Sequence, residues 1–426
     1  MIDKARKKAF VLLTEVLEEG KFSNLALKKG LEGFSQIDKS FITALVYGTI
    51  DKIINIDYVI SLYARGKVNA KVKNILRLGA FQVLYMDKVP DSAAVNTSVE
   101  LAKDIGKGML SGFINGVLRN VSRNKQNIPY PKEDVKRISV KYSYPEFLVA
   151  EMIAARGVEA TELACKYEGE HKTCLRFLSK EKMQEFCAKN ESMPARYFDE
   201  CAYISGEAKI SAEVSVQSES SLAAVKALSV KQNENVLDCC AAPGGKTVCI
   251  AQALNGNGKV KALDKYPHRV ELIKNNAKRC NVADTVEAFC ADMTSENDLG
   301  LFDKVLVDAP CSGLGVVDQK PEIKLNITPE ALKEIEQTQI KILQNASKHV
   351  KSGGVLVYST CTVRDQENID IVKQFLQKNK DFYLDDMTNL FGTKFEQGRQ
   401  VEKGFVQLYP EKDLIDGFFI SRMKRI

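Results

Sequence analysis

The spacing of hydrophobic residues changes along the chain and divides it into three parts. Up to about residue 125, apolar side chains recur every three or four positions, as at Phe10, Leu13 and Leu17 and again at Val72 and Leu76, and few Pro or Gly residues interrupt them. This period is typical of amphipathic helices. Residues 133–215 combine a helical stretch after Pro145 with short strand-like stretches. From about residue 216, short apolar runs alternate with helical segments.

The last part of the chain predicts a sheet covered by helices. Apolar runs suited to strands lie at 235–240, 260–264, 286–292, 302–310 and 354–360. One helix begins at Pro267, and another begins near Thr328-Pro329 and is expected to end near Gly353-Gly354. Strands that alternate with helices favour an α/β fold with a doubly wound, mostly parallel sheet. Ligands of such sheets bind outside the carboxyl ends of the strands.

The expected domain boundaries follow from these changes in pattern. Residues 127–132 (NIPYPK) contain two prolines and are typical of a domain exit. We therefore expect an all-helical domain at 1–130, a linker with a small mixed α+β domain at 131–215, and the α/β domain at 216–426.

Charge is unevenly distributed over the 426 residues. Residues 1–130 hold 20 Lys and Arg against 12 Asp and Glu, whereas the remaining 296 residues hold 41 against 43. A basic N-terminal third suits a partner that carries phosphates, such as RNA. A solvated, Lys-rich helical surface would give the same balance, so charge alone leaves both interpretations open.

Other features of composition narrow the class of protein. The N-terminal stretch lacks the pattern of a signal peptide, and no apolar run approaches the roughly 20 residues that span a bilayer. We expect a cytoplasmic protein without a membrane partner. The eleven cysteines all lie between 165 and 361 without a C-x-x-C pair, and only three histidines are present. We therefore expect no metal site.

A glycine turn follows the first strand of the α/β part. Residues 238–247 (DCCAAPGGKT) lead from this strand into a helix, whose N-terminal N–H groups can bind an anion. A P-loop would need Gly where Cys240 stands, and a dinucleotide site would need G-x-G-x-x-G, which is absent. An S-adenosylmethionine site remains, because the carboxylate of that cofactor can lie at the helix N-terminus.

Four aspartates follow four successive strands, at Asp238, Asp264, Asp292 and Asp308. A single Asp in such a place is usually a helix cap or turn residue. Four in succession favour a ligand site. Asp264 can accept hydrogen bonds from both ribose hydroxyls, and Asp292 is placed to meet an adenine.

Cys311 and Cys361 each follow a strand, and such loops converge at one edge of a doubly wound sheet. Two thiols suit methylation of cytosine at carbon 5. A thiolate that adds to carbon 6 makes carbon 5 nucleophilic, and a second group then assists release of the first. Asp308 can hydrogen-bond the base at N3 and favour the attack. Spacing alone leaves open which Cys attacks, and it also permits both to be packing residues.

The sequence resembles the RNA cytosine-5 methyltransferases of the Sun/NOL/NOP type. The words that carry this resemblance are DCCAAPGGKT, ALDKYPHRVELIKNN, FDKVLVDAPCSGLG, SGGVLVYSTCTVRDQEN and DGFFISRMKR, in order, over about 216–426. Residues 1–130 resemble, more loosely, the all-helical RNA-binding NusB domain, through RKKAFVLLTEV, DKSFITALVYGTI and FINGVLRN. Asp51-Lys52 stands where such domains often carry Arg.

The resemblance implies a Rossmann-like, S-adenosyl-L-methionine-dependent methyltransferase domain and assigns roles to matching residues. Cys361 would be the nucleophile and Cys311 would assist release, with Asp308 as the third catalytic residue. The residues that would bind the cofactor are Cys240, Ala241, Ala242, Pro243, Gly244, Gly245, Lys246, Asp264, Asp292 and Asp308.

The expected function is methylation of carbon 5 of a cytosine in 16S ribosomal RNA, because the pairing of domains is similar to that of bacterial enzymes with this activity. The RNA would be free or in an early particle, and the enzyme a monomer. One alternative is a ribosome assembly factor whose methyltransferase domain only clamps RNA. Another is a cytosine-5 methyltransferase of a different RNA, such as tRNA.

Overall fold

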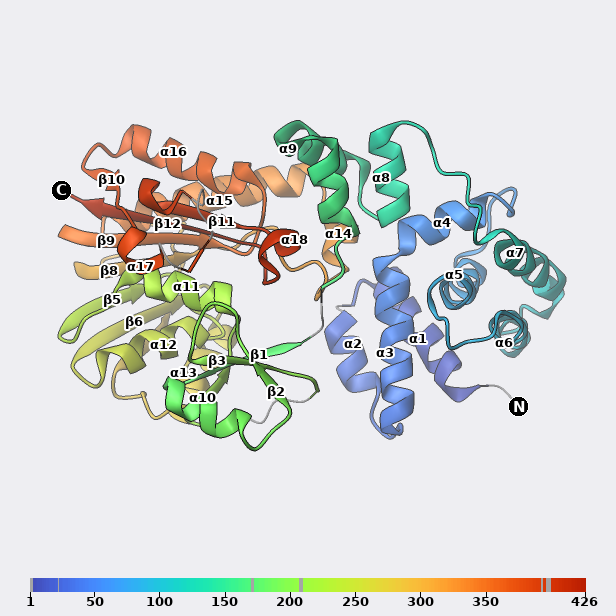
Figure 1. Ribbon diagram of the computed structural model, residues 1–426, viewed down its shortest axis with the longest axis horizontal. Helices are drawn as coiled ribbons and strands as arrows, with labels where there is room; N and C mark the ends of the chain where they lie inside the picture. The colour runs from blue at the N-terminus through green and yellow to red at the C-terminus, as the bar shows by residue number, and fades with distance from the viewer. Residues whose placement is uncertain (1–2, 22, 170–171, 207–209, 392–393, 396–399) are drawn as a thin grey trace. The chain divides into compact units, whose positions relative to one another are not determined.

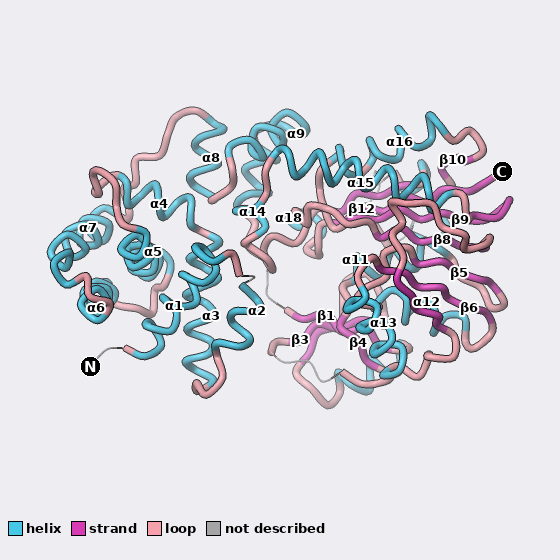
Figure 2. Tube along the Cα trace, turned by 180° about the vertical axis from the view of Figure 1, so that it is seen from behind, coloured by secondary structure: helices cyan, strands magenta, loops and turns pink. Residues whose placement is uncertain are grey.

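The described part of the chain before residue 173 forms helices without strands, and strands alternate with helices after it, as the computed structural model shows (Figures 1 and 2). It describes all residues except 1–2, 22, 170–171, 207–209, 392–393 and 396–399. Contacts divide the chain into two compact units. The first comprises residues 1–166 and 320–326, and the second comprises residues 167–319 and 327–426.

The described residues of the first unit form helices joined by loops, without a strand. Its elements are α1 (Lys4–Glu19), α2 (Ser23–Gly30), α3 (Gln36–Asp51), α4 (Ile53–Ser61), α5 (Ala70–Tyr85), α6 (Asp91–Asp104), η1 (Gly108–Leu110), α7 (Ser111–Asn124), α8 (Asp134–Tyr142), α9 (Glu146–Lys166) and α14 (Ile323–Asn326). Leu13 of α1 and Leu76 of α5 lie fully buried in its core, as their helical spacing predicts. Residues 134–166, from the expected connecting domain, form two of these helices.

Helix α14 belongs to the first unit although it lies within the sequence of the second. Leu325 packs against the helical core, and Ser23 donates a hydrogen bond to Glu322. The buried ammonium of Lys324 lies 2.5 Å from a carboxylate oxygen of Asp51 and 4.5 Å from the ring centre of Tyr144. The chain therefore leaves the second unit at 319, docks on the helical core, and returns at 327.

The second unit begins with a small antiparallel sheet. Its elements are β1 (Thr173–Phe177), α10 (Lys180–Cys187), β2 (Ser192–Pro194), β3 (Cys201–Ile204) and β4 (Val214–Val216), with strand order β2-β3-β1-β4. The fully buried carboxylate of Glu219 accepts hydrogen bonds from the backbone of 196–198 and from Tyr203. This carboxylate fastens the small sheet to the helix that follows.

The large sheet carries the α/β architecture. Its strands are β5 (Glu234–Asp238), β6 (Gly258–Asp264), β7 (Val286–Cys290), β8 (Phe302–Asp308), β9 (Val350–Thr360), β10 (Phe382–Leu384), β11 (Phe405–Leu408) and β12 (Phe418–Arg425). The order is β10-β12-β9-β8-β5-β6-β7, with β11 paired to β12. Strands β5 to β9 pair in parallel, whereas β10, β11 and β12 pair antiparallel. The doubly wound, mostly parallel sheet is confirmed.

Helices cover both faces of this sheet (Figure 1). On one face lie α11 (Glu219–Leu228), α12 (Gly245–Leu254) and α13 (Pro267–Arg279); on the other lie α15 (Pro329–Ser347) and α16 (Ile369–Lys378). In β8, Leu306 packs on the face of the sheet that α11 and α12 cover, whereas Val305 and Val307 pack on the face that α15 and α16 cover. The short elements η2 (Asp365–Glu367), α17 (Thr388–Phe391), η3 (Val401–Lys403) and α18 (Pro410–Asp413) complete the unit.

One expected helix end is wrong. Helix α15 ends at Ser347, and Gly353-Gly354 lie inside β9. Gly353 has a φ of 73°, and the pairing of β8 with β9 shifts register in this region. A Cβ on Gly354 would lie 2.8 Å from the carbonyl oxygen of Lys351. The two glycines therefore serve a strand irregularity with close backbone packing rather than a helix exit.

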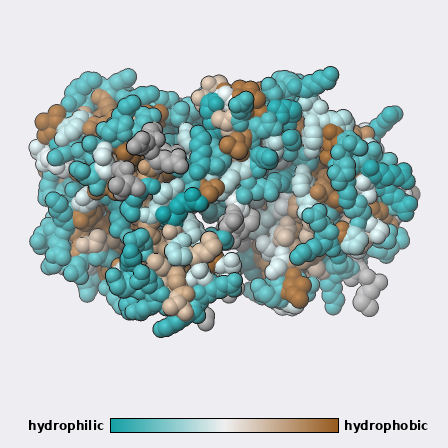
Figure 3. All heavy atoms as spheres, viewed as in Figure 1, coloured by the Kyte–Doolittle hydropathy of each residue, from teal (hydrophilic) through white to brown (hydrophobic). Residues whose placement is uncertain are grey.

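Hydrophilic side chains cover most of the face in Figure 3, and apolar ones form small separate patches. Among the described helices, none has the length and apolar character needed to cross a membrane.

Candidate active site

The site forms where the chain reverses the direction in which it adds strands. From β5 the chain proceeds to β6 and β7 on one side, and then to β8 and β9 on the other. Such a switch point leaves a crevice beyond the carboxyl ends of the two central strands. Asp238 ends β5 and Asp308 ends β8, so both lie at this edge.

The glycine turn joins β5 to α12. The backbone of Ala241 donates to Leu263 of β6, and Gly244 adopts a φ of 103° before the helix begins at Gly245. The bond between Ala242 and Pro243 is cis. No side chain caps α12, and a Cβ on Gly245 would meet no described atom within 4 Å. Free N–H groups at an open helix N-terminus suit an anionic group.

The carboxyl group of Asp238 lies fully buried beside this turn. One oxygen accepts a hydrogen bond from Thr247 at 2.7 Å, and the other has no hydrogen-bond partner among the described residues. Burial raises the pKa of Asp238 to about 7, against the hydrogen bond from Thr247 and with a contribution from the charge of Asp308. An unsatisfied buried oxygen of this kind calls for a donor from a ligand.

The next two acids along the sheet are held by local contacts. The nearly buried Asp264 accepts from the backbone of Tyr266 and lies 3.2 Å from the guanidinium of Arg269. Asp292 accepts from the backbone and hydroxyl of Thr294 and pairs with Lys265 at 3.0 Å. Burial would raise the pKa of Asp292, but the contacts with Thr294 and Lys265 outweigh it and lower that pKa.

Asp308 connects the glycine turn to the strand that leads to Cys361. One carboxylate oxygen lies 2.8 Å from the ammonium of Lys246, and the other accepts from Ser359 at 2.8 Å. Burial acts to lower the pKa of Lys246, but the charges of Asp308, Cys361 and Asp238 and the hydrogen bond to Asp308 raise it overall. Lys246 therefore stays protonated beside Cys361.

The two candidate thiols lie together. The sulfur atoms of Cys311 and Cys361 are 3.3 Å apart, within hydrogen-bonding distance, and both side chains are half-buried. Burial and the surrounding carboxylates, Asp238 first, raise the pKa of the neighbouring Cys240, which therefore remains a thiol. The structure thus brings Cys311, Cys361 and Asp308 to one place.

Comparisons with known proteins identify the family of this chain. The family described as 16S rRNA methyltransferase RsmB/F matches residues 225–424, and the NusB family matches residues 3–123. The chain is 35% identical to the probable ribosomal RNA small subunit methyltransferase B of Bacillus subtilis (strain 168), over 98% of both chains. The chain belongs to the RsmB/F methyltransferase family.

Two further proteins have a lower sequence identity to this chain. The 28S rRNA (cytosine(4447)-C(5))-methyltransferase of Homo sapiens is 32% identical over 49% of this chain and 27% of its own length. The crystal structure of PH0851 superposes with a TM-score of 0.80 and 21% identity, and covers 100% of this chain and 99% of that one. This likeness concerns the fold.

Members of this family are S-adenosyl-L-methionine-dependent methyltransferases, and the residues at the switch point fit that cofactor. The unsatisfied oxygen of Asp238 suits the amino group of the cofactor, and the open turn at Gly245 suits its carboxylate. Asp264 and Asp292 follow along the same edge, at the ends of β6 and β7.

Several residues at the site were not singled out from the sequence. Ser359 binds Asp308, Glu367 binds the backbone of Ser312, and Gly417 packs against Gly315. Glu367 and Gly417 lie within words that carry the family resemblance, RDQEN and DGFF. Those words were the available signal, but their spacing gave no reason to place either residue beside the thiols.

Proposed function

We propose that this chain transfers the methyl group of S-adenosylmethionine to carbon 5 of a cytosine in 16S ribosomal RNA, with Cys361 as nucleophile and Cys311 assisting release. The observation that carries this proposal is the pair of sulfur atoms 3.3 Å apart, beside the Asp308–Lys246 ion pair. The family membership and the named activities of relatives support the substrate class.

The position of Lys246 supports the choice of Cys361 as the attacking thiol. An adjacent ammonium stabilises a thiolate, and the thiolate is the reactive form of cysteine. Lys246 interacts electrostatically with Cys361. The proton of Cys361 must leave before attack, and an ordinary thiol is only a few per cent ionised at neutral pH.

In the first covalent step, the sulfur of Cys361 forms a bond to carbon 6 of the cytosine. The electron pair of the carbon 5–carbon 6 double bond moves toward carbon 5. In this proposal Asp308 hydrogen-bonds N3 of the base and stabilises its protonated form, which favours the attack. The target base must leave any stacked helix to reach this edge of the sheet.

Carbon 5 then takes the methyl group, which the bound cofactor supplies as an electrophile on its sulfonium. Release requires that the hydrogen of carbon 5 leave as a proton, and in this proposal the thiolate of Cys311 accepts it. The electrons of that C–H bond restore the double bond and expel Cys361 as a thiolate. Cys311, with its sulfur beside that of Cys361, assists this release.

We further propose that the helical unit and the small sheet bind the RNA. The surplus of basic residues in 1–130 supports this assignment, because phosphate contacts dominate RNA affinity. In this proposal the enzyme acts as a monomer in the cytoplasm.

Tritium release from 16S RNA labelled at carbon 5 of cytosine, with and without the cofactor, tests the reaction. We expect cofactor-dependent release and 5-methylcytosine at one position. The Cys361→Ala variant should give neither product nor adduct. The Cys311→Ala variant should retain a protein–RNA adduct on denaturing gels, because attack proceeds while release stalls.

The alternatives make different predictions in the same assay. Exchanged phenotypes of the two cysteine variants would reverse the assigned roles. Release from tRNA but not from 16S RNA, tested free and in small-subunit particles, would identify another RNA as substrate. RNA binding without any tritium release would favour an assembly factor.

A further inference from the structure

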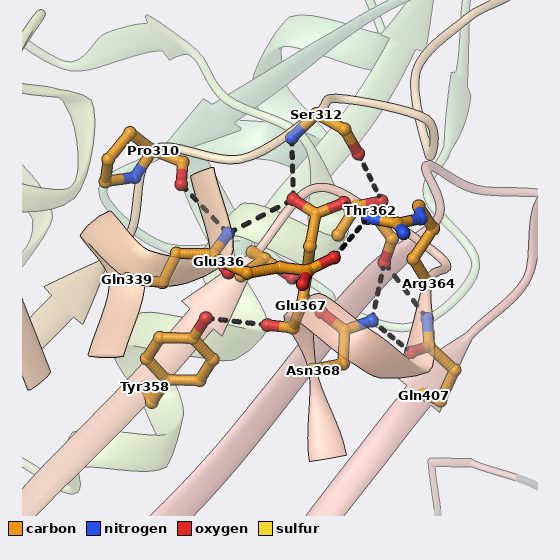
Figure 4. A network of polar contacts seen from close by, with 11 residues as sticks. Pro310, Ser312, Glu336, Gln339, Tyr358, Thr362, Arg364, Glu367, Asn368 and Gln407 are labelled. Carbon is orange, nitrogen blue, oxygen red and sulfur yellow. Dashed lines mark hydrogen bonds and ion pairs between the residues drawn. The ribbon is translucent and has the colours of Figure 1, made fainter. Parts of the chain in front are cut away.

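A buried polar network joins the loops that carry the two thiols, and Glu367 is at its centre (Figure 4). This side chain is fully buried in η2. One carboxylate oxygen accepts from the backbone of Ser312 at 2.8 Å and from Gln339 at 3.1 Å, and the other lies 3.1 Å from Arg364. The network therefore reaches the residue that follows Cys311.

The residue that precedes Cys311 is held by the same network. Gln339 of α15 donates one hydrogen bond to the carbonyl oxygen of Pro310 at 3.0 Å and another to Glu367. Both backbone neighbours of Cys311 are thus fixed by two side chains that also bind each other. The hydroxyl of Ser312 lies 2.8 Å from that of Thr362, which links the two cysteine loops directly.

The next residue, Asn368, holds Cys361 in a matching way. Its amide nitrogen donates to the carbonyl oxygen of Thr362 at 3.0 Å, and its oxygen accepts from the hydroxyl of Thr360 at 2.5 Å. Asn368 is also fully buried. Asn368 therefore binds both chain neighbours of Cys361, whereas Glu367 binds one neighbour of Cys311 directly and the other through Gln339.

Stability of the fold gives little reason for a carboxylate at this place. Burying a charge costs several kcal/mol, and well-packed apolar residues of similar volume often stabilise a core as much or more. Fixed backbone neighbours do have a use where two reacting sulfurs must keep their positions, because catalytic groups lose efficiency when displaced by about 1 Å.

We propose that Glu367 and Asn368 are positioning residues for the reaction, in which Glu367 places the Cys311 thiol and Asn368 places the Cys361 thiol. The inference rests on the proposed function in one respect, the separate roles of the two thiols in release and attack. Neither residue touches the reacting atoms; each acts through the loop that it binds.

Electrostatics add to the difference between the thiols. The hydrogen bond with Cys361 raises the pKa of Cys311, and burial and the charges of Cys361 and Glu367 raise it further. Tyr358 also faces this thiol; burial raises its pKa, so it remains neutral. Glu367 thus increases the proton affinity of Cys311, which suits a group that takes the proton of carbon 5, whereas Lys246 favours an ionised Cys361.

A first experiment needs no RNA. In a Cys361→Ser background, the rate at which iodoacetamide alkylates Cys311 is measured against pH, with peptide mass spectrometry to separate it from the other cysteines. Glu367→Gln should move the midpoint to lower pH by about one unit, because it removes a nearby negative charge. Identical midpoints with and without Glu367→Gln would contradict the proposal.

Glu336→Gln is the matched control. Glu336 lies 3.1 Å from the same Arg364 nitrogen, and its partial exposure and its position on α15 distinguish it from Glu367. This substitution removes one of the two carboxylates that pair with Arg364, but it leaves the hydrogen bond between Ser312 and Glu367 in place. Its alkylation midpoint should stay at the parent value.

A second experiment measures turnover in the full-length enzyme with RNA. Glu367→Gln should lower kcat about 10- to 100-fold with little change in KM, and adduct should accumulate because release is slowed. Asn368→Ala should instead slow adduct formation. Glu367→Asp, which keeps the charge on a shorter side chain, should retain the parental alkylation midpoint but not the parental kcat.

The two proposals fail separately. If Cys361→Ala still forms product, the proposed reaction is wrong, whatever the Glu367 variants do. If the cysteine variants behave as expected but Glu367→Gln matches the parent in either assay, only the positioning role is wrong. Should Glu367→Gln fail to fold, Gln339→Met removes the bonds to Pro310 and Glu367 without stranding a charge, and it should also accumulate adduct.

Discussion

At the scale of single residues, Lys246 connects the glycine turn to Asp308. Its ammonium is 2.8 Å from Asp308 and 5.5 Å from the ring centre of Phe418, and it interacts electrostatically with Cys361, the proposed nucleophile. Its place in the loop sequence, after two glycines, resembles a phosphate-binding lysine. Here the ammonium of Lys246 instead forms an ion pair with the carboxylate of Asp308.

Replacing this lysine should therefore affect chemistry more than binding. Lys246→Met should lower kcat about 10- to 100-fold, since a hydrogen bond to a charged group contributes about 1.5–3 kcal/mol. Steady-state methylation assays measure this. Lys274→Met on α13, which removes an exposed pair with Glu271, should stay within about twofold of the parent. Equal effects of the two substitutions would argue against a special role for Lys246.

Asp238 gives a pH prediction at the same scale. Its pKa of about 7 in the fold exceeds the value near 4 of an unfolded chain. Between these values the folded state holds a proton that the unfolded state has released. The contribution of Asp238 to stability is therefore fully present below about pH 4 and is lost as the pH rises through about 7.

Thermal unfolding of the parent and of Asp238→Asn, measured from pH 4 to 8, checks this prediction. Asn stays neutral throughout, so the melting temperature of the parent relative to the variant should fall as the pH rises. A difference that stays constant over this range would show that Asp238 ionises normally in the fold.

At the scale of elements, the site depends on backbone contacts between loops that follow different strands. The amide of Gly315 donates to the carbonyl oxygen of Cys361 at 3.0 Å, and the amide of Gly417 donates to that of Gly315 at 2.8 Å. A Cβ on Gly315 would lie 2.0 Å from the carbonyl oxygen of Gly417. The segments after β8 and β9 and before β12 are therefore in close backbone contact.

Gly315→Ala should force these segments apart. We expect a loss of roughly 1–3 kcal/mol in the free energy of unfolding, as for overpacked sites, together with slower adduct formation. Gly116→Ala in α7 is the control, because its added Cβ meets no described atom within 4 Å and should stabilise the helix by up to about 1 kcal/mol. Similar stabilities of the two variants would contradict the close contact.

At the scale of the whole molecule, the chain order and the compact units differ at one segment. Residues 320–326 follow the loop that carries Cys311, yet they pack with the helical core through α14. The carboxylate of Asp51 pairs with the buried ammonium of Lys324. This ion pair holds α14 within the first unit.

Lys324→Met should release this segment. Breaking a buried ion pair by removing one partner costs roughly 3 kcal/mol or more, so the transition of the helical unit should shift to lower temperature. Limited proteolysis should then cut within 320–326 faster than in the parent. Lys333→Met, at an exposed position of α15, should change neither measurement. Unchanged proteolysis in Lys324→Met would show that α14 stays docked without its ion pair.

The sequence by itself determined the elements whose signal is local. Periodic apolar residues such as Leu13 and Leu76 predicted helices, runs such as 302–310 predicted strands, and the turn at 238–247 predicted the cofactor class. Local patterns suffice here because burial on one face is written into the spacing of neighbouring residues. The antiparallel strands β10 to β12 and the end of α15 were missed, since pairing partners and a strand irregularity depend on distant residues.

Only the tertiary structure decided which side chains meet. The 3.3 Å between two sulfurs fifty residues apart, the two buried residues behind them, and the docking of 320–326 on the helical core all arise from packing across the fold. A contact of this kind exists because separate elements bury their apolar faces together. Sequence spacing specifies each face but not the distance between side chains on different elements.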